Sequence, residues 1–183
     1  MRFAPYLPSE RGQPPLDVRV ALLSERDLQD VALLYADREG LPHAEARAWW
    51  QRAWDRRRAP SGKTTFVART CREGALVGYG SVQHISPGRA PGSRTQCPAG
   101  FYLAGLVIAE HVRRRGIGSA LVERRLAWLE RRAAECFYVA NERNQATDAL
   151  HQRFGFVELA RDVWLPGVTF DRGAGLLFRR SRE

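Results

Sequence analysis

The chain has 183 residues, 44% of them hydrophobic and 27% charged, which indicates one globular domain and argues against a disordered or fibrous protein. The formal net charge of +9 favours an anionic partner without choosing among nucleic acid, an anionic membrane surface and a polyphosphate cofactor. No apolar run approaches the roughly 20 residues that span a membrane, and the three cysteines lack zinc-site spacing and favour a reducing cytoplasm, so we expect no metal.

The first segment, residues 1–16, is polar and rich in proline, and it lacks the apolar core of a signal peptide. We therefore expect a flexible tail there and a single domain over 17–183. Asp17–Leu22 predicts the first strand. Ser24 and Asp27 form a capping-box pattern that begins a helix. The expected apolar face of that helix comprises Leu28, Val31, Ala32 and Tyr35.

A second helix is expected from His43 to about Arg57, after a break at Gly40-Leu41-Pro42. Thr65–Thr70 and Leu76–Ile85 predict two strands joined by a turn. Ser86–Ala99 is rich in proline, glycine and polar residues, so it predicts a long loop of the kind that often covers a binding site.

The second half of the chain begins with Phe101–Ala109, which is apolar almost throughout, as expected of a strand buried on both faces. An amphipathic helix is expected over Ser119–Ala134. The remaining predicted elements are a strand at Cys136–Ala140, a short helix at Thr147–Phe154, and strands at Phe156–Ala160 and Leu176–Arg180. This order of elements predicts a mixed α/β architecture.

A basic, glycine-containing run links the buried strand to the amphipathic helix. Backbone N–H groups at a helix start lack intrahelical acceptors and lie at the positive end of the helix dipole, so they bind phosphate. The run contains neither a Walker loop nor the third small residue of a dinucleotide fingerprint. It predicts a pyrophosphate site formed by Arg113, Arg114, Arg115, Gly116, Ile117, Gly118, Ser119 and Ala120.

The pattern Arg113-x-x-Gly116-x-Gly118 resembles the acyl-CoA-binding turn of the GNAT superfamily of N-acetyltransferases. A second family pattern is an Asn that precedes a Gly-Phe pair by eleven residues. Asn144 and Gly155-Phe156 match it here. Two motifs at the right separation are far more specific than either alone, and the order of elements agrees over most of the chain.

The resemblance implies a mixed, mostly antiparallel sheet flanked by helices, with a central strand followed by the Arg/Gly pyrophosphate turn and a helix. It implies acetyl-CoA as co-substrate, and direct attack of a primary amine on the thioester in a ternary complex. The edge formed by Leu106, Val107 and Ile108 would bind the pantetheine arm. Asn144 would hold that arm from the other side.

The resemblance also nominates His151 as the catalytic acid, because the family usually has a Tyr at this position whose hydroxyl protonates the departing thiolate. A free imidazole titrates near ~6.5 and can donate a proton at neutral pH. The base is less defined, because Phe101–Ala109 holds no carboxylate. His84 is the better of the weaker candidates, followed by Glu110 and His111, and water is the alternative.

The acceptor pocket implied by the resemblance draws on Trp49, Trp50, Trp54, Trp164, Phe170 and Asp171, although core packing is the alternative for the helix tryptophans. The expected acceptor is a small-molecule amine, antibiotic-like or amino-acid-like, with a protein amine as the alternative. A non-catalytic acyl-CoA sensor is a second alternative. Nucleic acid is disfavoured, because the helix arginines alternate with glutamates and no nucleic-acid motif is present. A homodimer is possible, and the sequence does not decide the oligomeric state.

Overall fold

The structure is a computed structural model that describes residues 14–58, 62–87, 90, 92, 94–170 and 173–182. Its strands are β1 (Val18–Leu22), β2 (Lys63–Thr70), β3 (Leu76–Ile85), β4 (Thr95–Gln96), β5 (Gly100–Ile108), β6 (Glu135–Asn141), β7 (Val157–Arg161), β8 (Val163–Trp164) and β9 (Gly175–Ser181). Its helices are α1 (Leu28–Glu39), α2 (His43–Asp55), α3 (Ile117–Leu129) and α4 (Gln145–Gln152), with 3-10 turns at Glu25–Asp27 and Glu110–Val112.

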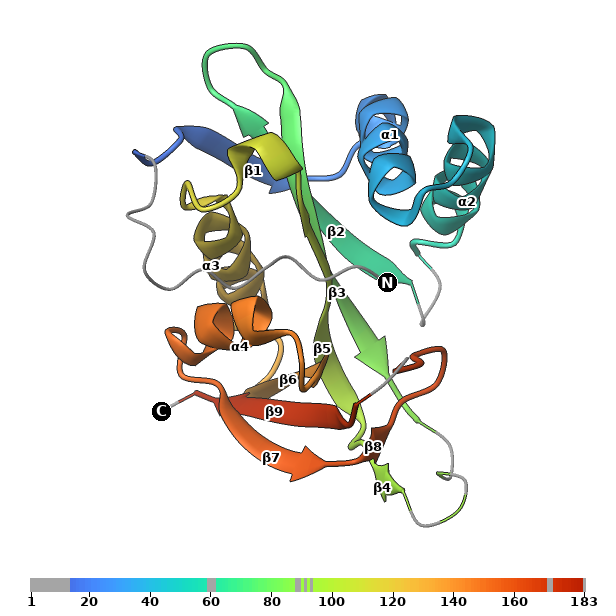
Figure 1. Ribbon diagram of the computed structural model, residues 1–183, viewed down its shortest axis with the longest axis vertical. Coiled ribbons are helices and arrows are strands. Elements are labelled where there is room, and N and C mark those ends of the chain that lie inside the picture. The colour runs from blue at the N-terminus through green and yellow to red at the C-terminus, as the bar shows by residue number, and fades with distance from the viewer. Residues whose placement is uncertain are drawn as a thin grey trace.

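Seven strands form one sheet in the order β1-β2-β3-β5-β6-β9-β7 (Figure 1). All neighbouring pairs are antiparallel except β5 and β6, which are parallel. A parallel pair needs a crossover, and α3 supplies it on one face of the sheet. The mixed, mostly antiparallel sheet flanked by helices is therefore confirmed.

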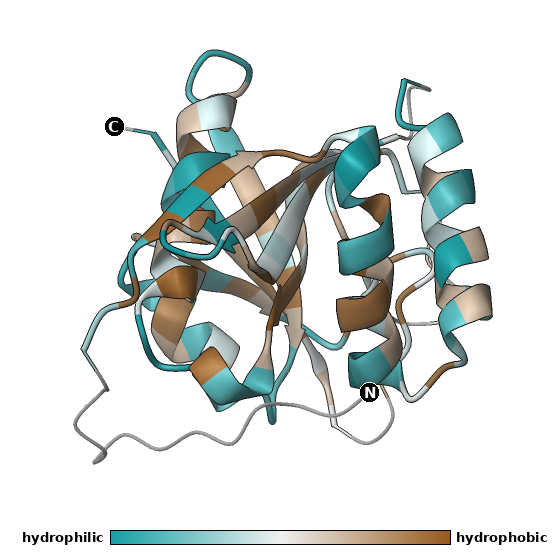
Figure 2. Ribbon diagram, turned by 90° about the horizontal axis from the view of Figure 1, so that it is seen from above, coloured by the Kyte–Doolittle hydropathy of each residue, from teal (hydrophilic) through white to brown (hydrophobic). Residues whose placement is uncertain are grey.

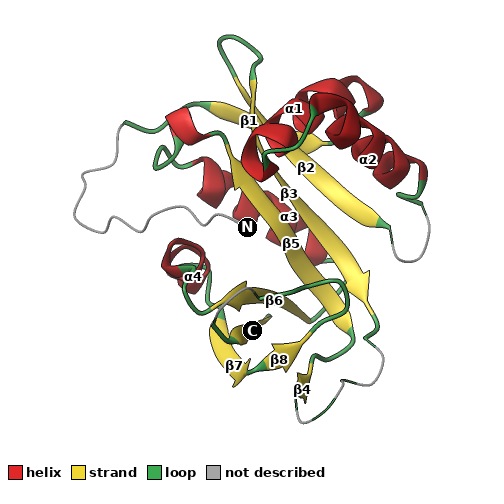
Figure 3. Ribbon diagram, turned by 45° about the vertical axis from the view of Figure 1, so that its right-hand side comes forward, coloured by secondary structure: helices red, strands yellow, loops and turns green. Residues whose placement is uncertain are grey.

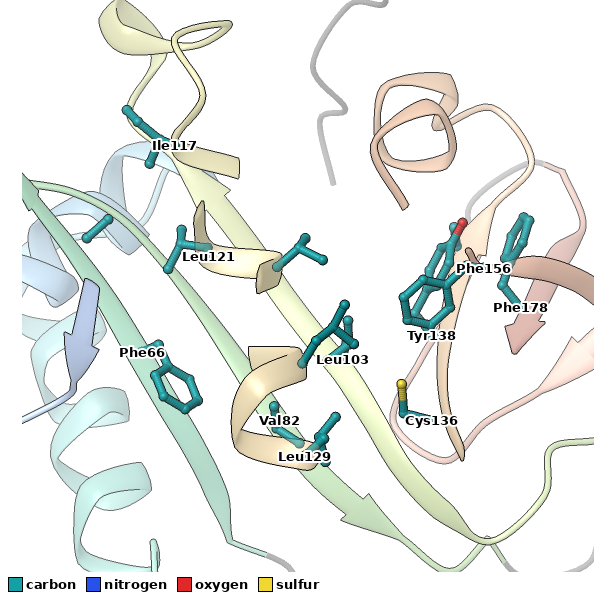
Figure 4. Packing of buried hydrophobic residues seen from close by; sticks show 14 of the residues in the cluster. Phe66, Val82, Leu103, Ile117, Leu121, Leu129, Cys136, Tyr138, Phe156 and Phe178 are labelled. Carbon is teal, nitrogen blue, oxygen red and sulfur yellow. The ribbon is translucent and has the colours of Figure 1, made fainter. Parts of the chain in front are cut away.

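Helix α3 covers one face of the sheet, and α1 and α2 cover the other. Successive residues of a strand therefore pack alternately against α3 and against α1 and α2. On β2, Phe66 packs into the cluster that contains α3, whereas Val67 packs into the cluster beneath α1 and α2. The α3 cluster extends across β6 to Tyr138, Phe156 and Phe178 (Figure 4). Hydrophobic segments gather between sheet and helices, and the outward helix faces are hydrophilic (Figure 2).

The capping box at the start of the first helical segment is present and is tied to the sheet. Asp27 Oδ2 accepts hydrogen bonds from the Ser24 backbone N–H and hydroxyl, each at 2.7 Å. Arg69 of β2 donates to Asp27 Oδ1 at 2.8 Å and to Asp30 at 2.7 Å. Burial alone would raise the pKa of Asp27, but the hydrogen bonds from Ser24 and Arg69 outweigh it and the pKa is lowered.

Two expectations about the elements were wrong in part. The stretch Ser86–Ala99 is not wholly loop, because β4 within it pairs in parallel with β8, a strand that the sequence did not predict. The helix expected to reach Ala134 ends at Leu129, whose carbonyl accepts from the N–H groups of Arg132 and Ala133 and closes the last turn. Residues 88, 89, 91 and 93 lie outside the described part of that stretch.

Arg125 of α3 lies in the core, 1% exposed. Its Nε donates to the Leu121 carbonyl at 3.1 Å and its Nη1 to the Ser81 carbonyl at 3.4 Å. Its Nη2 has no hydrogen-bond partner among the described residues, and burial lowers the pKa of the guanidinium to about 10. A buried charge without a counter-ion is costly to the folded state.

We therefore expect Arg125→Met to raise the free energy of unfolding by about 1 kcal/mol, because the gain from removing a desolvated charge exceeds the loss of two hydrogen bonds of about 1 kcal/mol each. Urea titration measures the change. Arg124→Met, at the exposed neighbouring position of α3, is the matched control and should be close to neutral. A loss of stability of more than about 1 kcal/mol in Arg125→Met would contradict the expectation.

Candidate functional site

The glycine turn forms the N-terminus of α3, as its sequence predicted. Gly116 is the N-cap, with a left-handed φ of 84°, and a Cβ placed there would meet nothing within 4 Å. The first intrahelical bond runs from the Ala120 N–H to the Gly116 carbonyl, at 3.1 Å. The N–H groups of Ile117, Gly118 and Ser119 precede that bond and point out along the helix axis. The turn therefore has the open approach and the donors that a pyrophosphate requires.

Two arginines of this turn, Arg113 and Arg115, donate hydrogen bonds to backbone carbonyls of the protein. Arg113 Nε donates to the Ile108 carbonyl at the end of β5, at 3.3 Å. Arg115 Nε donates to the Pro14 carbonyl at 3.1 Å, and the Arg115 carbonyl accepts from the Leu16 N–H at 3.0 Å. The tail expected over residues 1–16 therefore joins the turn at 14–16, whereas residues 1–13 lie outside the described part of the chain.

Two further cationic residues lie close to the N-terminus of α3. Arg114 is exposed and has a left-handed φ of 66°, which is uncommon for a residue with a side chain. Arg153, just after α4, donates to Ser119 Oγ at 3.0 Å. The sequence did not single out Arg153, because it lies more than thirty residues from the turn and reaches it only through the packing of α4 on α3.

Strands β5 and β6 diverge beside this turn (Figure 3). Their described register contains a single pair, Tyr102 with Phe137. Beyond that pair the β6-facing edge of β5 has no strand partner within the described residues, and this edge includes Leu106, Val107 and Ile108. An unpaired strand edge offers backbone N–H and C=O groups to an extended ligand. It leads from the opening between the strands towards the glycine turn.

A β-bulge at Gly105 lies at the start of this free edge. Gly80 pairs with Leu106 and Ser81 with Ala104, so Gly105 is the extra residue, and its φ of 53° is left-handed. A bulge bends the strand and reverses which face the following residues occupy. An isolated glycine within an apolar strand pattern is the signal that would have predicted it.

A cavity of about 980 Å³ lies on the α1/α2 face of the sheet and reaches the opening between β5 and β6. On β5 it is lined by Ala104 and Gly105, and on the β6 side by Asn141 and Asn144. It therefore meets the free β5 edge at the bulge. Its volume is within the usual range for small-ligand pockets, about 300–1,000 Å³.

The outer wall of the cavity is aromatic. Trp49 stacks on Tyr35 with ring centroids 5.0 Å apart, and Trp50 meets Tyr79 edge to face at 5.1 Å. All four line the cavity, together with Trp54. The helix tryptophans thus serve both as packing and as lining, and Trp50 is the most buried of the three.

Of the other residues predicted to line the acceptor pocket, some line this cavity and others do not. Phe170 lines the cavity, whereas Trp164 does not; it lies in β8, where it pairs with Gln96. Asp171 lies outside the described residues. His84 is on the opposite face of β3 from the lining residues Gln83 and Ile85, and its ring meets Phe101 instead. Neither Trp164 nor His84 therefore lines this cavity.

Glu39 is a lining residue that sequence reasoning missed. It lies at the end of α1, with its carboxylate 3.3 Å from Arg38 Nε. It follows Tyr35 at the i, i+4 spacing, so both side chains share one helix face. That spacing was the available signal, but it identifies a face and not what the face encloses.

His151 is buried beneath α4, 2% exposed, with its ring stacked on Tyr138 at a centroid distance of 4.2 Å. Its Nδ1–H donates to the Thr147 carbonyl at 2.8 Å, so Nε2 carries the lone pair, without a partner among the described residues. Burial, with the charge of Arg125 adding to it, lowers the pKa of His151 to about 4. This corrects the titration range expected of a free imidazole, and the side chain is neutral at pH 7.

Asn144 is the N-cap of α4, and its Oδ1 accepts from the Thr147 N–H at 3.4 Å. It lies on the cavity wall, on the β6 side of the opening. Among the described residues, no helix is both long enough and apolar enough to cross a membrane. The described residues also contain no group of His, Cys, Asp or Glu side chains that could hold a metal ion.

Comparison with known proteins agrees with this geometry. The model of the acetyltransferase (GNAT) family matches residues 28–156. Among solved structures, the ribosomal-protein-alanine N-acetyltransferase of Brucella melitensis is 26% identical, with a TM-score of 0.65, over 90% of this chain and 99% of that one.

Two further structures share the fold. A GNAT-family acetyltransferase from Bordetella pertussis is 17% identical, with a TM-score of 0.70, over 94% of this chain and all of that one. An acetyltransferase from Salmonella typhimurium, crystallised with its cofactor acetyl-CoA, is 17% identical with a TM-score of 0.62, over 90% and 93% of the two chains. The search of curated proteins gave no match.

Proposed function

This chain belongs to the GNAT family of acetyltransferases, and from that premise we propose that it transfers an acetyl group from acetyl-CoA to a primary amine of a small molecule. The observation that carries the choice of a small acceptor is the cavity of about 980 Å³, which has an aromatic wall and meets the free edge of β5 at the bulge. An amine held there would lie beside the end of the acyl-CoA arm.

The residues present fit acetyl-CoA. The N–H groups of Ile117, Gly118 and Ser119 would bind its pyrophosphate, with Arg114 and Arg153 adding positive charge. The free β5 edge at Leu106–Ile108 would bond the pantetheine arm, and Asn144 would contact it from across the opening. When bound, the thioester supplies the electrophilic carbon that a neutral amine attacks directly in a ternary complex.

Two proton transfers must accompany the attack. The acceptor amine must lose a proton, and Glu39 is the carboxylate among the described lining residues, so we assign it as the base, acting directly or through water. The leaving thiolate must gain a proton, and His151 is the proposed source, although its ring is buried and is not among the residues that line the cavity. A neutral His151 must first be protonated at Nε2, so we expect the acid step to draw on a minor protonated form.

Replacing His151 tests this assignment. We expect His151→Phe to lower kcat at least tenfold, at the low end for loss of a general acid, with little change in KM for acetyl-CoA. His151→Tyr should recover part of the loss, because a hydroxyl proton returns. Phenylalanine keeps the ring stacked on Tyr138, so it is a better test than alanine. If kcat of His151→Phe equals that of the wild type across pH, His151 has no part in the reaction.

The proposed activity is tested by measuring thiol release from acetyl-CoA in the presence of small amines, together with a thermal shift. Acetyl-CoA at ~100 times its Kd should stabilise the folded chain by about 2.7 kcal/mol. Amine-dependent release with this stabilisation supports transfer. Stabilisation without release by any amine identifies an acyl-CoA sensor, and no stabilisation by any acyl-CoA contradicts the cofactor assignment.

A protein amine is the second candidate, favoured by the 26% identity to a protein whose name describes N-acetylation of an alanine of a ribosomal protein. A short peptide with a free N-terminal alanine should then exceed free small amines in kcat/KM by at least tenfold. The same peptide with a blocked N-terminus is the control. Equal or weaker reaction of the free peptide would favour the small-molecule acceptor.

A further inference from the structure

The wall of the acceptor cavity carries an excess of positive charge. Its charged residues within the described chain are Arg38, Glu39, Arg57 and Lys63. Arg38 and Glu39 neutralise each other as an ion pair. Arg57 and Lys63 have no carboxylate within ion-pair distance among the described residues.

The backbone segments that carry these two cations lie against each other in the wall. Gly62, which precedes Lys63, packs against the Arg57 carbonyl so tightly that a Cβ on Gly62 would clash with it. Arg57 is held in place, because its Nη1 donates to the Trp54 carbonyl at 2.7 Å. The Lys63 side chain is exposed at the edge of the cavity, and partial desolvation there lowers its pKa.

Both cations also occupy aromatic surface. The Arg57 guanidinium carbon lies 3.6 Å from the centre of the Trp54 ring, and Lys63 Nζ lies 5.9 Å from the centre of the Trp49 ring. Aromatic faces that already bind a cation of the protein are not free to bind a cationic ligand. The faces of Trp54 and Trp49 that bind Arg57 and Lys63 are therefore already occupied by cations of the protein.

We propose that the acceptor is an amine that also carries an anionic group, a carboxylate or a phosphate, which binds Arg57 and Lys63. The inference rests on the proposed transfer to a small amine and names the acceptor's class. The anion compensates two charges that the fold leaves unpaired, whereas a polycationic amine would be repelled by them.

The two cations also assist the reaction by positioning the acceptor. An anionic group bound at Arg57 and Lys63 also fixes one end of the acceptor, which leaves the amine to be directed towards the opening between β5 and β6.

Matched pairs of amines test the proposal through thiol release from acetyl-CoA. L-Phenylalanine is compared with phenethylamine, and phosphoethanolamine with ethanolamine, so that each pair differs in the anionic group. We expect kcat/KM to be at least tenfold higher for the anionic member of at least one pair, and the better pair distinguishes carboxylate from phosphate. Spermidine and kanamycin, as polycations, should react more slowly than the preferred acceptor.

Substitutions of Arg57 and Lys63 test whether these residues cause the preference for anionic amines. Arg57→Met and Lys63→Met should each reduce the preference for the anionic amine about three- to tenfold, and the double variant should abolish it. Arg52→Met, an exposed position of α2 outside the cavity lining, should leave it unchanged. The thermal shift with acetyl-CoA should be the same in all four proteins.

The outcomes separate this proposal from the proposed activity. Equal kcat/KM within each pair, or preference for the neutral or polycationic amines, overturns the anionic class but leaves acetyl transfer intact. A preference that survives in the double variant also overturns it, because another site must then bind the anion. Absence of release with every amine overturns the acceptor class, and the thermal shift then shows whether acetyl-CoA binding stands.

Discussion

Replacing Gly116 by alanine is expected to weaken acetyl-CoA binding about tenfold. Gly116 has a φ of 84° at the N-cap of α3, and an L-residue in left-handed backbone costs about 1–2 kcal/mol. A Cβ at this position meets nothing within 4 Å, so the effect comes from the backbone angle alone and not from a clash. The turn would relax towards negative φ and move the N–H groups of the first helical turn away from the pyrophosphate.

Gly74→Ala is the matched control. Gly74 lies in the β2–β3 turn with a φ of 69°, and a Cβ there also meets nothing within 4 Å. The two substitutions should therefore cost similar free energy of unfolding, measured by urea titration, but only Gly116→Ala should change the acetyl-CoA affinity, measured by calorimetry. Equal affinities for the two variants would show that the turn does not contact the cofactor through its backbone.

The fold followed from the sequence where local signals were strong. Hydrophobic periodicity and the glycine and capping signals located the long strands, α1, α2, α3 and α4, with boundaries off by a few residues. The short strands β4 and β8 were missed, because a two-residue strand has no period of its own and forms only through its partner. The membership of the family rested on two motifs, Arg113-x-x-Gly116-x-Gly118 and Asn144 with Gly155-Phe156, and the family match confirms it.

The site was less accessible to sequence reasoning, because its properties depend on contacts between distant segments. The arginine run suggested three phosphate ligands, yet Arg115 bonds to Pro14 and Arg113 to Ile108. The excess charge of the acceptor cavity comes from Arg57, just after α2, and Lys63, at the start of β2; they are near in sequence, but no local pattern shows that both line a cavity. Likewise, the helical position of His151 was predictable, whereas its burial against β6 was not.

That burial leads to the second large effect, on stability. Between pH 7.5 and pH 4.5 the wild-type chain is expected to lose about 2–3 kcal/mol of stability relative to His151→Phe. The folded pKa of His151 is lowered to about 4, below an unfolded value of about 6.5. A base with a depressed folded pKa contributes stability that is complete above the unfolded pKa and is lost as the pH falls towards the folded one. Phenylalanine does not titrate, so the variant lacks this loss.

A neighbouring carboxyl acts in the opposite direction. Burial raises the pKa of Asp148 to about 6, although the hydrogen bond from the Tyr138 hydroxyl at 3.4 Å opposes the rise. An acid with a raised folded pKa contributes stability at low pH that is lost as the pH rises through 6. Falling pH therefore costs stability at His151 and returns part of it at Asp148, so the two offset each other in the wild-type chain.

Single variants separate the two groups. In His151→Phe the free energy of unfolding, from urea titration, should increase as the pH falls from 7.5 to 4.5, because the Asp148 contribution is then unopposed. In Asp148→Asn it should decrease by about 2–3 kcal/mol over the same range, and the double variant should be nearly flat. The lowered pKa of Asp27 acts only below its ordinary value of 3.8 and so lies outside this window. Parallel pH profiles for the wild type and His151→Phe would show that the pKa of His151 is the same in the folded and unfolded chain, which would contradict the lowered folded pKa.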